Sequence, residues 1–511
     1  MNTAATSAGD VPNKAFITAS IMLAALMQTL DTTIANVALP HIQGSVAASQ
    51  DQIVWVLTSY IVAAAIMTPL TGWLSDRFGI KTVFLWSVAG FTVASMLCGA
   101  AQSLGQIVIF RLLQGVAGAA LMPLTQAVLF SINPPHKYGQ AMSTFGLAVI
   151  LGPLLGPVLG GWLTENYSWR WVFYINLPIG LAALFGIFTF LPSRRHAEPR
   201  KFDFFGFGTL ALAIGAFQLL LDRGQQNDWF AARETWIELT VAGLCAYLFV
   251  VHTLTAERSF FSRDLLRDRN FVSSTVASFF VMGVLFGSLA LVPPLMQHLY
   301  GYPVLTTGIV TMPRGVGTFI AMLAVGRLTN RIDPRLLIGA GLILCAHSFW
   351  AMSGFTLEMG SWPFVWTGFE QGIAMGLVFV PLSALGFGAL PGHLRVEGTT
   401  VYNIVRNIGG SVGISAGTAL LTQNSQRFHA LLAEHVRPDN PLMRPPYMPP
   451  GMIDTPQGLQ ALNAMITKQA TFLAYLNDFW VMAVVLLLLV PGLFLMRKPA
   501  RAPDAPPAAM E

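Results

Sequence analysis

Charged residues are scarce in this chain, and their scarcity excludes most classes of protein. Only 29 basic and 24 acidic side chains occur among 511 residues, or 10% of the chain, whereas a soluble domain carries roughly 25%. So few charges cannot coat a soluble protein of this size, and the shortage also excludes a disordered chain or a coiled coil. Cysteine is scarcer still: Cys98, Cys245 and Cys345 lie far apart within apolar runs, a spacing that indicates neither a disulfide framework nor a metal site.

Two signatures of cofactor chemistry are also missing. No Gly-Lys-Ser/Thr phosphate loop occurs in the sequence, so ATP hydrolysis by this chain is not expected. No cluster of His, Cys and Asp has the spacing of a metal site. We therefore expect no catalytic residues, no bound metal and no cofactor.

Long apolar runs take the place of the missing charge. A bilayer core ~30 Å thick is crossed by a helix of ~20 apolar residues. Charge-free intervals of that length recur in a chain that is 54% hydrophobic, among them 52–75, 82–110, 112–136, 138–164 and 171–193. We predict an all-α integral membrane protein with fourteen membrane-spanning helices, at about 15–35, 53–74, 82–101, 106–127, 142–163, 171–191, 204–221, 236–256, 271–293, 304–326, 336–355, 362–382, 399–422 and 477–496.

The sequence repeats itself weakly at an interval of about 257 residues. The segment 72–77 (GWLSDR) is echoed at 326–331 (GRLTNR), the pair 114–115 (QG) at 371–372, and glycines 152, 156 and 160 at 409, 413 and 417. Three matches in one order indicate two related bundles of six helices, an architecture of secondary transporters. We predict an N-terminal bundle in 1–200, two inserted helices in 201–257, and a C-terminal bundle in 258–498.

An even number of spans puts both termini on one side of the membrane. Of the 29 Lys and Arg residues, nineteen fall in loops on that side, seven in loops on the opposite side and three inside spans. Because Lys and Arg concentrate in cytoplasmic loops, we predict cytoplasmic termini. The net charge of +5 is then a topology signal, and it leaves no basic patch for nucleic acid.

Two polar segments lie outside the spans. The outer loop 423–475 is proline-rich in its centre, where regular helix is not expected. After it, Thr455 and Pro456 are typical of a cap and first helical residue, and an amphipathic stripe follows from Leu459 to Leu473. The tail 499–511 is rich in Ala and Pro, and we expect it to be disordered.

A few ionisable residues fall inside the predicted spans. An Asp, Lys or Arg at mid-bilayer costs ~2.5–3.5 kcal/mol on insertion scales, so it is tolerated where it faces a cavity or a partner. The five residues in such places are Asp31, Arg111, Glu370, Arg314 and Arg406.

Asp31 and Arg111 are the first candidates for proton coupling. A carboxylate whose surroundings alternate between two compartments can bind a proton on one side and release it on the other. The alternative for Asp31 is an acid at a helix end, solvated at the outer interface. Arg111 cannot neutralise itself by losing a proton, so it needs a carboxylate, carbonyls or water. It could pair with Asp31, or it could be a structural hydrogen-bond hub.

Glu370 is the only acid deep in a span of the C-terminal half. It is a second proton-coupling candidate or a sensor of substrate charge, with Arg314 and Arg406 as possible charge partners. The alternative is a buried ion pair that holds the C-terminal bundle together.

Glycines mark one face of the fifth span. Gly152, Gly156 and Gly160 recur every four residues and so share one helix face, which lets another helix approach closely. Pro157 bends the same helix. The stripe predicts either a static packing face or one that slides and seals during transport.

The loop between the second and third spans is short and charged. Gly79 can adopt the positive φ of a tight turn, and Asp76 is expected near the start of the third span, where a helix N-terminus favours an acid. Gly72 and Arg77 lie in the same segment. Anchoring by basic residues on the cytoplasmic side explains Arg77, but it does not explain Asp76.

These motifs together resemble the major facilitator superfamily, within it the fourteen-helix drug:proton antiporter branch, and within that the EmrB-like multidrug efflux permeases. The resemblance covers residues from about 15 to 496. It rests on 72–81 (GWLSDRFGIK), 111–115 (RLLQG, with Gln114 and Gly115), 152–161 (GPLLGPVLGG), 30–40 (LDTTIANVALP), 169–180 and 221–224. One departure is Asn330, which stands in the second repeat where the first has Asp76.

The resemblance implies efflux of lipophilic or amphipathic compounds driven by inward proton flow across a bacterial inner membrane. It implies Asp31 and Arg111 as coupling residues, and the partners would be a periplasmic adaptor and an outer-membrane channel. The loop 423–475 is placed as in these proteins and is either a docking site for the adaptor or a passive lid. The alternatives are a dedicated exporter of one metabolite or siderophore and, in another class, a membrane-embedded enzyme or receptor.

Overall fold

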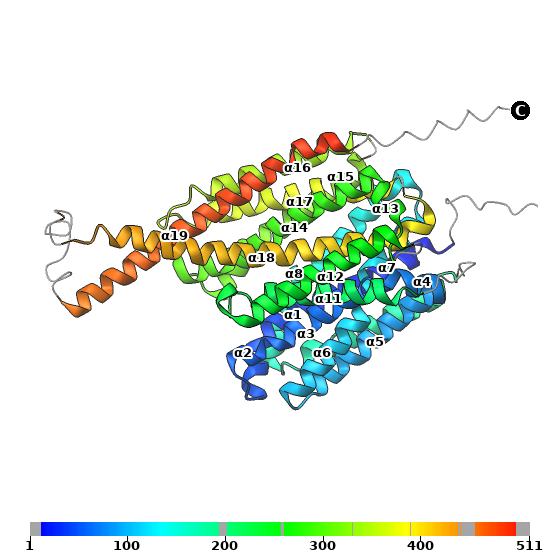
Figure 1. Cartoon of the computed structure of the whole chain (residues 1–511), viewed down its shortest axis with the longest axis horizontal. Helices are drawn as coiled ribbons and strands as arrows, with labels where there is room; N and C mark the ends of the chain where they lie inside the picture. The colour runs from blue at the N-terminus through cyan, green and yellow to red at the C-terminus, as the bar shows by residue number, and fades with distance from the viewer. Residues whose placement is uncertain are drawn as a thin grey trace, which may run out of the picture.

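The computed structural model describes residues 12–193, 202–256, 260–329, 331–388, 390–437, 440 and 455–496. All regular structure in these ranges is helical (Figure 1). The N-terminal helices are α1 (Lys14–Ser45), α2 (Gln50–Ile53), α3 (Trp55–Met67), α4 (Leu70–Phe78), α5 (Ile80–Ala100), α6 (Leu104–Gly118), α7 (Leu121–Ile132), α8 (Tyr138–Asn166), α9 (Trp171–Tyr174) and α10 (Asn176–Phe190).

The remaining helices begin with a pair and end with a long hairpin. The pair is α11 (Phe204–Arg223) and α12 (Arg233–Thr255). They are followed by α13 (Arg263–Arg267), α14 (Arg269–Pro294), α15 (Val304–Leu328), α16 (Pro334–Met352), α17 (Trp362–Gly388), α18 (Arg395–Ala433) and α19 (Pro456–Leu489).

The number of spans agrees with the predicted fourteen once two unusual ones are included. Among the described residues, twelve helices are long and apolar enough to cross a membrane, and the bent pair α3 and α4 makes a thirteenth. The fourteenth is α18, which is more polar but packs along α14 and α19. The 57° bend between α3 and α4 falls beside Pro69, which lacks the N–H that would continue the helix.

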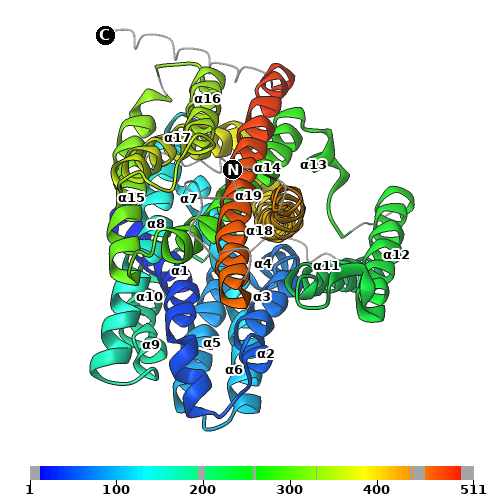
Figure 2. The same ribbon diagram turned by 90° about the vertical axis from the view of Figure 1, so that its left-hand side faces the viewer.

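The helices form two groups, with α11 and α12 at the side (Figure 2). Helices α1 to α10 pack on one another, and so do α14 to α19. Helix α11 lies against α3 of the first group and α18 of the second, whereas α12 packs on α11. We call the two groups the N bundle (α1–α10) and the C bundle (α14–α19).

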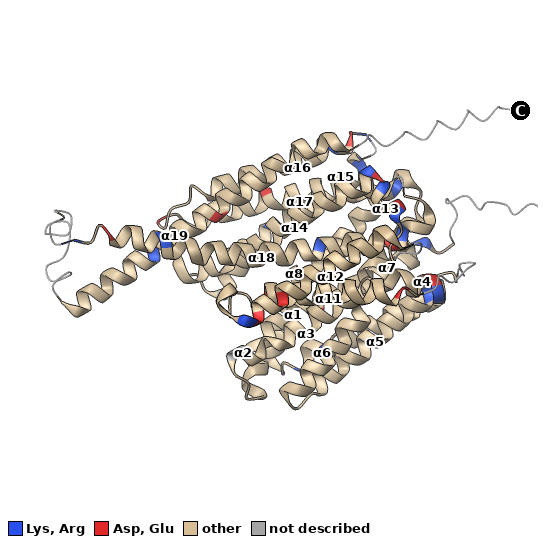
Figure 3. Cartoon of the chain, viewed as in Figure 1, with Lys and Arg blue, Asp and Glu red and all other residues tan. Residues whose placement is uncertain are grey.

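The two ends of the molecule differ. Helix α1 begins and α19 ends at the same end, and Lys and Arg gather there (Figure 3). At the opposite end α18 and α19 extend beyond the other helices (Figure 1). We call the first the basic end; its assignment to the cytoplasm stays a prediction.

The long outer loop is therefore partly helical. At the first margin of the predicted outer loop 423–475, α18 continues to Ala433, which the sequence did not predict, whereas the helix expected to begin at Pro456 is present as α19. The cap at Thr455 is confirmed: its Oγ1 accepts a hydrogen bond from the Gly458 N–H at 3.1 Å, and Pro456 is the first helical residue. Nearly all of the proline-rich centre and the whole tail 499–511 lie outside the described residues.

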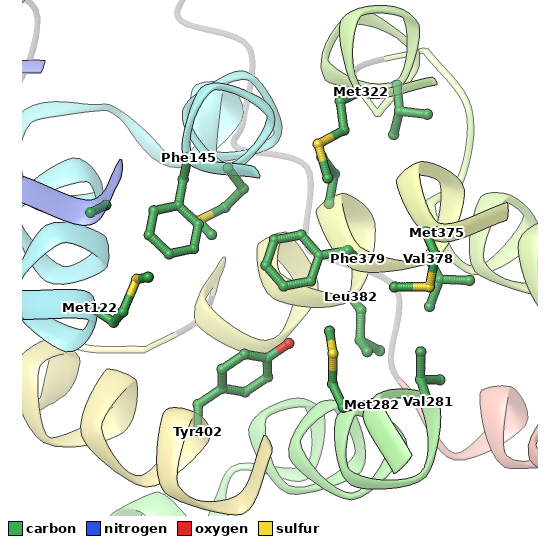
Figure 4. Packing of buried hydrophobic residues seen from close by; sticks show 14 of the residues in the cluster. Met122, Phe145, Val281, Met282, Met322, Met375, Val378, Phe379, Leu382 and Tyr402 are labelled. Atoms are coloured by element: carbon green, nitrogen blue, oxygen red, sulfur yellow. The ribbon is translucent and has the colours of Figure 1, made fainter. Parts of the chain in front are cut away.

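The two bundles meet in the half of the molecule nearer the basic end. Asn403 donates to Gln126 Oε1 at 2.6 Å and Arg395 donates to the Phe130 carbonyl at 3.2 Å. Ser143 donates to the Met322 carbonyl across the same interface. Figure 4 shows the apolar part of this contact, in which the Phe145 ring of α8 lies near the Phe379 ring of α17. These contacts close the space between the bundles at the basic end.

The glycine stripes let helices touch backbone to backbone. A Cβ on Gly152 would lie 2.7 Å from the backbone of Thr29 in α1. In the C bundle, a Cβ on Gly413 of α18 would lie 1.9 Å from the carbonyl oxygen of Gly283 in α14. Each stripe thus packs on the first helix of its own bundle. The structure shows the packing face, and sliding of these faces stays a prediction.

We expect Gly413→Ala to lower stability, because the new Cβ collides with backbone that cannot rotate away. Overpacking of this kind costs about 1–3 kcal/mol. The matched control is Gly417→Ala on the same face, where the nearest atom is a Leu291 side-chain carbon at 3.4 Å. Thermal unfolding of the two purified variants by fluorescence compares them. Equal melting temperatures would contradict the backbone contact between α14 and α18.

Candidate functional site

Asp31 lies in the interior of the N bundle. It falls inside α1, which runs well beyond it to Ser45, and its side chain is 1% exposed. A solvated acid at a helix end, the alternative reading of the sequence, is not what the structure shows. Apolar neighbours on the outer side, including Leu30, Ile34 and Phe173, belong to one buried cluster, so bulk water does not reach the carboxylate in this state.

Three side chains donate hydrogen bonds to the Asp31 carboxylate. Arg111 Nη1 of α6 donates to Oδ2 at 2.6 Å. Gln114 Nε2, one turn further along α6, donates to Oδ1 at 2.9 Å. Asn176 Nδ2 at the start of α10 donates to the same oxygen at 2.8 Å. Both oxygens of the Asp31 carboxylate therefore accept hydrogen bonds, one of them from a cation.

Arg111 has partners other than Asp31. Its Nε donates to the carbonyl of Val56 in α3 at 3.1 Å, and its Nη1 also donates to Gln114 Oε1 at 2.8 Å. The guanidinium lies 4.3 Å from the ring centroid of Tyr60 and 5.8 Å from that of Phe173, which adds cation–π attraction. These contacts would hold the guanidinium in place if Asp31 became neutral.

Gly115 explains how α6 reaches α3. A Cβ there would lie 2.4 Å from the carbonyl oxygen of Tyr60, so only glycine permits this approach. The close crossing of α6 and α3 brings Arg111 within reach of the Val56 carbonyl. The short sequence from Arg111 to Gly115 therefore supplies a cation, an amide donor and a packing glycine to one site.

Asn176 and Ser95 complete the network and were not identified as site residues from the sequence. Asn176 Nδ2 donates to Ser95 Oγ at 2.9 Å, and Ser95 donates to the carbonyl of Phe173 at 2.9 Å. Asn176 carried a signal, since it belongs to the segment 169–180 that resembles the family. Ser95 carried none, because a serine among the small residues of α5 is ordinary.

The loop after α4 departs from the prediction in one respect. Asp76 lies in the last turn of α4, not at the start of α5. Gly79 ends α4 with φ 85°, the positive value expected for it. Arg77 stacks on Trp73, 5.5 Å from the ring centroid. Gly72 faces the C bundle, because its Cβ would lie 3.8 Å from the Cα of Glu397.

Glu370 has a partner that differs from the expected ones. Its Oε2 lies 3.2 Å from His347 Nδ1 of α16. Within the described part of the chain, neither Arg314 nor Arg406 forms an ion pair with it. Arg314 instead donates to Ser288 at 3.1 Å. The expected pairing with an arginine is wrong, and a role of Glu370 in coupling stays a prediction.

The arrangement brings one acid and one cation together in the interior of the N bundle. No group of three or more His, Cys, Asp or Glu side chains lies close together in the described ranges. If Arg111 were displaced, Gln114 and Asn176 would still orient the Asp31 carboxylate.

Comparisons with known proteins agree with this geometry. The model of the Major Facilitator Superfamily matches residues 21–414. The chain is 35% identical to the multidrug export protein EmrB of Escherichia coli over 94% of this chain and 95% of that protein. It is 34% identical to the fatty acid resistance protein FarB of Neisseria gonorrhoeae, over 95% and 96% of the two chains.

Solved structures share the fold. The proton:xylose symporter XylE aligns with a TM-score of 0.60 at 14% identity, covering 93% of this chain and 96% of that one. The human organic anion transporter MFSD10 aligns with a TM-score of 0.56 at 17% identity, covering 93% and 100%.

Proposed function

The chain belongs to the Major Facilitator Superfamily, and from this premise we propose that it exports lipophilic and amphipathic compounds in exchange for protons. It is a multi-pass membrane transporter and not an enzyme. Its relatives are named for multidrug export and fatty acid resistance, which supports a broad apolar cargo. The membrane we assign is a bacterial inner membrane, with both termini in the cytoplasm.

The observation that carries the proton-coupling proposal is the burial of Asp31 against Arg111. Both side chains are 1% exposed, and a buried charge persists only with a partner. Protonation of Asp31 would dissolve the ion pair, and Arg111 would keep its hydrogen bonds to Val56 and Gln114. The site can switch between these two arrangements, and binding of cargo or of a proton shifts the equilibrium between them.

The space between the bundles supports alternating access. In this conformation the bundles are joined at the basic end, by hydrogen bonds such as that of Asn403 with Gln126. Parting of those contacts would open the basic end to cargo, while the outer ends come together. Because a proton and a cargo molecule are not bound at the same time, the cycle exchanges protons for cargo.

Whole cells test this function directly. Cells that express the protein should extrude a lipophilic dye, and an ionophore that collapses the proton gradient should stop extrusion at once. Cells with the empty vector control for other pumps. Extrusion that continues unchanged after the gradient is collapsed, at constant ATP, would refute proton coupling.

We also propose that the outer helical hairpin, α18 after Thr418 together with α19 before Phe472, docks a periplasmic adaptor that leads to an outer-membrane channel. Its two helices are tied by Ser425 to Thr471 at 3.0 Å and by His429 to Asn463 at 3.0 Å. Leu459 and Met465 are exposed on either side of the buried Leu462. These exposed apolar side chains lie on a hairpin that extends beyond the bundles, where a helix of a partner protein can pack against them.

Replacing Leu459 and Met465 together by Glu should abolish co-purification of a co-expressed periplasmic adaptor. The matched control is Ala464→Glu, which is exposed on the opposite side of α19. Transport by the purified double variant in liposomes should stay unchanged, because the hairpin lies outside the bundles. Full recovery of the adaptor with the double variant would leave the hairpin as a passive lid.

A further inference from the structure

The inserted helix α11 is in contact with both bundles. On one side it packs on α3 of the N bundle, and on the other it meets α18 of the C bundle (Figure 2). The pair α11 and α12 lies between the two bundles in the sequence and belongs to neither of them. Because the proposed export cycle moves the bundles relative to each other, α11 cannot keep both contacts unchanged.

The contact with α3 is apolar and tight. A Cβ on Gly215 would lie 2.9 Å from Cδ1 of Ile66 in α3. The Arg223 guanidinium at the end of α11 lies 5.6 Å from the ring centroid of Trp55, the first residue of α3, which adds cation–π attraction. Closely packed side chains resist displacement, so we expect α11 to move together with the N bundle.

The contact with α18 includes hydrogen bonds. Gln218 Nε2 donates to Ser411 Oγ at 3.0 Å, and Ser415 Oγ donates to the Leu221 carbonyl at 3.1 Å. Both serines lie in the half of α18 that leads to the outer hairpin. Exchange of such hydrogen bonds for hydrogen bonds with water has a small net cost. The contact with α18 is therefore the one that can open.

Asp222 belongs to this contact. Gln218 Nε2 also donates to Asp222 Oδ1 at 3.0 Å, so one amide group joins the acid to α18. Oδ2 of the same carboxyl is buried and has no hydrogen-bond partner. Among the described residues, no Lys, Arg or His lies within ion-pair distance of Asp222. The neighbouring Arg223 instead pairs with Glu234 and Glu238 of α12, at 3.1 and 3.8 Å.

The helices around Asp222 offer little that stabilises a negative charge. The segment 411–422 of α18 has no ionisable side chain, and the only one in α3 is Tyr60, which lies beside Arg111. A carboxylate with one oxygen buried and unpartnered is unfavourable, and a bound proton removes its charge. The residue as a whole is only partly buried, so protons from the outer side reach it.

We propose that Asp222 is a second proton-binding residue, which holds the inserted helix α11 on α18 while it is protonated. Separation of the two helices would expose the carboxyl to water, which stabilises the charged form, and the proton would leave. By reciprocity, an acidic exterior favours the joined arrangement and an alkaline exterior favours the separated one. The inference assumes the movement of the bundles that the proposed function includes, but it does not depend on Asp31.

Distances between spin labels test the inference without cargo and without a proton gradient. In a chain whose three native cysteines are replaced, Leu212→Cys on α11 and Leu420→Cys on α18 place nitroxides at exposed positions. In nanodiscs, the ratio of the short to the long distance should rise at least ~10-fold from mildly alkaline to acidic pH. A tenfold difference in proton affinity between the two arrangements shifts their ratio by that factor.

Three variants show which acid responds. Asp222→Asn keeps the size of the side chain without its charge, so α11 and α18 should stay joined at every pH. The matched control is Asp228→Asn, an exposed acid in the turn after α11, which should respond as the wild type does. The response should also persist in Asp31→Asn, which separates this inference from the proposed coupling.

A second pair of variants keeps the test decisive if Asp222→Asn does not fold. Gln218→Met removes the hydrogen bond that favours the charged carboxyl, so the distance ratio should begin to rise at a higher pH than in the wild type. Gln225→Met is the matched control, because Gln225 donates to Thr422 Oγ1 of α18 at 3.2 Å and not to an acid. In this control the rise should begin at the pH of the wild type.

Two results would overturn the proposal. One is a wild-type distance ratio that is the same at acidic and at alkaline pH. The other is a response in Asp222→Asn that is as large as in the wild type. If that variant does not fold, a response of Gln218→Met that begins at the same pH as in the wild type has the same consequence.

Discussion

Asp31→Asn is expected to abolish cargo-induced proton release from inverted membrane vesicles. The substitution keeps the size of the side chain and most of its hydrogen bonds with Gln114 and Asn176, but it removes the group that binds the proton. We expect a fall of transport to the level of vesicles without the protein. A pH-sensitive dye reports the release when a lipophilic substrate is added.

Two controls separate coupling from folding. Glu165→Gln removes an exposed acid at the outer part of α8 and should leave proton release unchanged. Asp31→Asn combined with Arg111→Gln removes the cation that the single variant leaves buried. A buried charge without its partner costs about 3–5 kcal/mol. The double variant should therefore be more stable than Asp31→Asn, and it should still be inactive. Normal coupling in Asp31→Asn would move the proton site elsewhere, with Glu370 next to test.

A disulfide across the basic end is expected to stop transport completely and reversibly. A Cβ on Gly326 of α15 would lie 3.1 Å from the Cβ of Ser143 in α8, and disulfides join Cβ atoms about 3.8 Å apart. In a chain whose three native cysteines are replaced, Ser143→Cys with Gly326→Cys should cross-link on oxidation. Because the bond ties the two bundles together where they must part, dye extrusion should cease.

Reduction serves as the internal control for this variant. Dithiothreitol should restore extrusion, and each single cysteine variant should be insensitive to oxidant. Mass spectrometry of a peptide pair measures the cross-linked fraction. A fully cross-linked protein that transports at the normal rate would show that the contact of α8 with α15 does not open during the cycle.

The membrane architecture could be predicted because each membrane-spanning helix is determined by one continuous segment of the sequence. A span needs an unbroken apolar run of fixed length, so helices such as α5 and α14 are evident from composition alone. Helix α18 was placed correctly in spite of its polarity, but its length beyond 422 was not predicted. Extension of α18 and α19 depends on their contact with each other, as between Ser425 and Thr471, and such contacts are not visible in either segment alone.

The site could be predicted in part. The cost of a charge in the bilayer singled out Asp31 and Arg111 without any structure, and the structure places them in contact. Asn176 and Ser95 are neutral and carry no such cost, so only the fold brings them to the carboxylate. For Glu370, the sequence offered Arg314 and Arg406 as possible partners, whereas the structure places it beside His347. The positions of charges along the sequence do not reveal which helices are neighbours.

Transport in liposomes with an imposed pH difference tests the central claim most directly. The purified protein is reconstituted, and uptake of a neutral lipophilic dye through molecules oriented with the basic end outward is measured with and without an acidic lumen. Our account predicts concentrative uptake when the lumen is acidic, none without the difference, and none for Asp31→Asn in either case. Equal uptake by the wild type with and without the pH difference would contradict it.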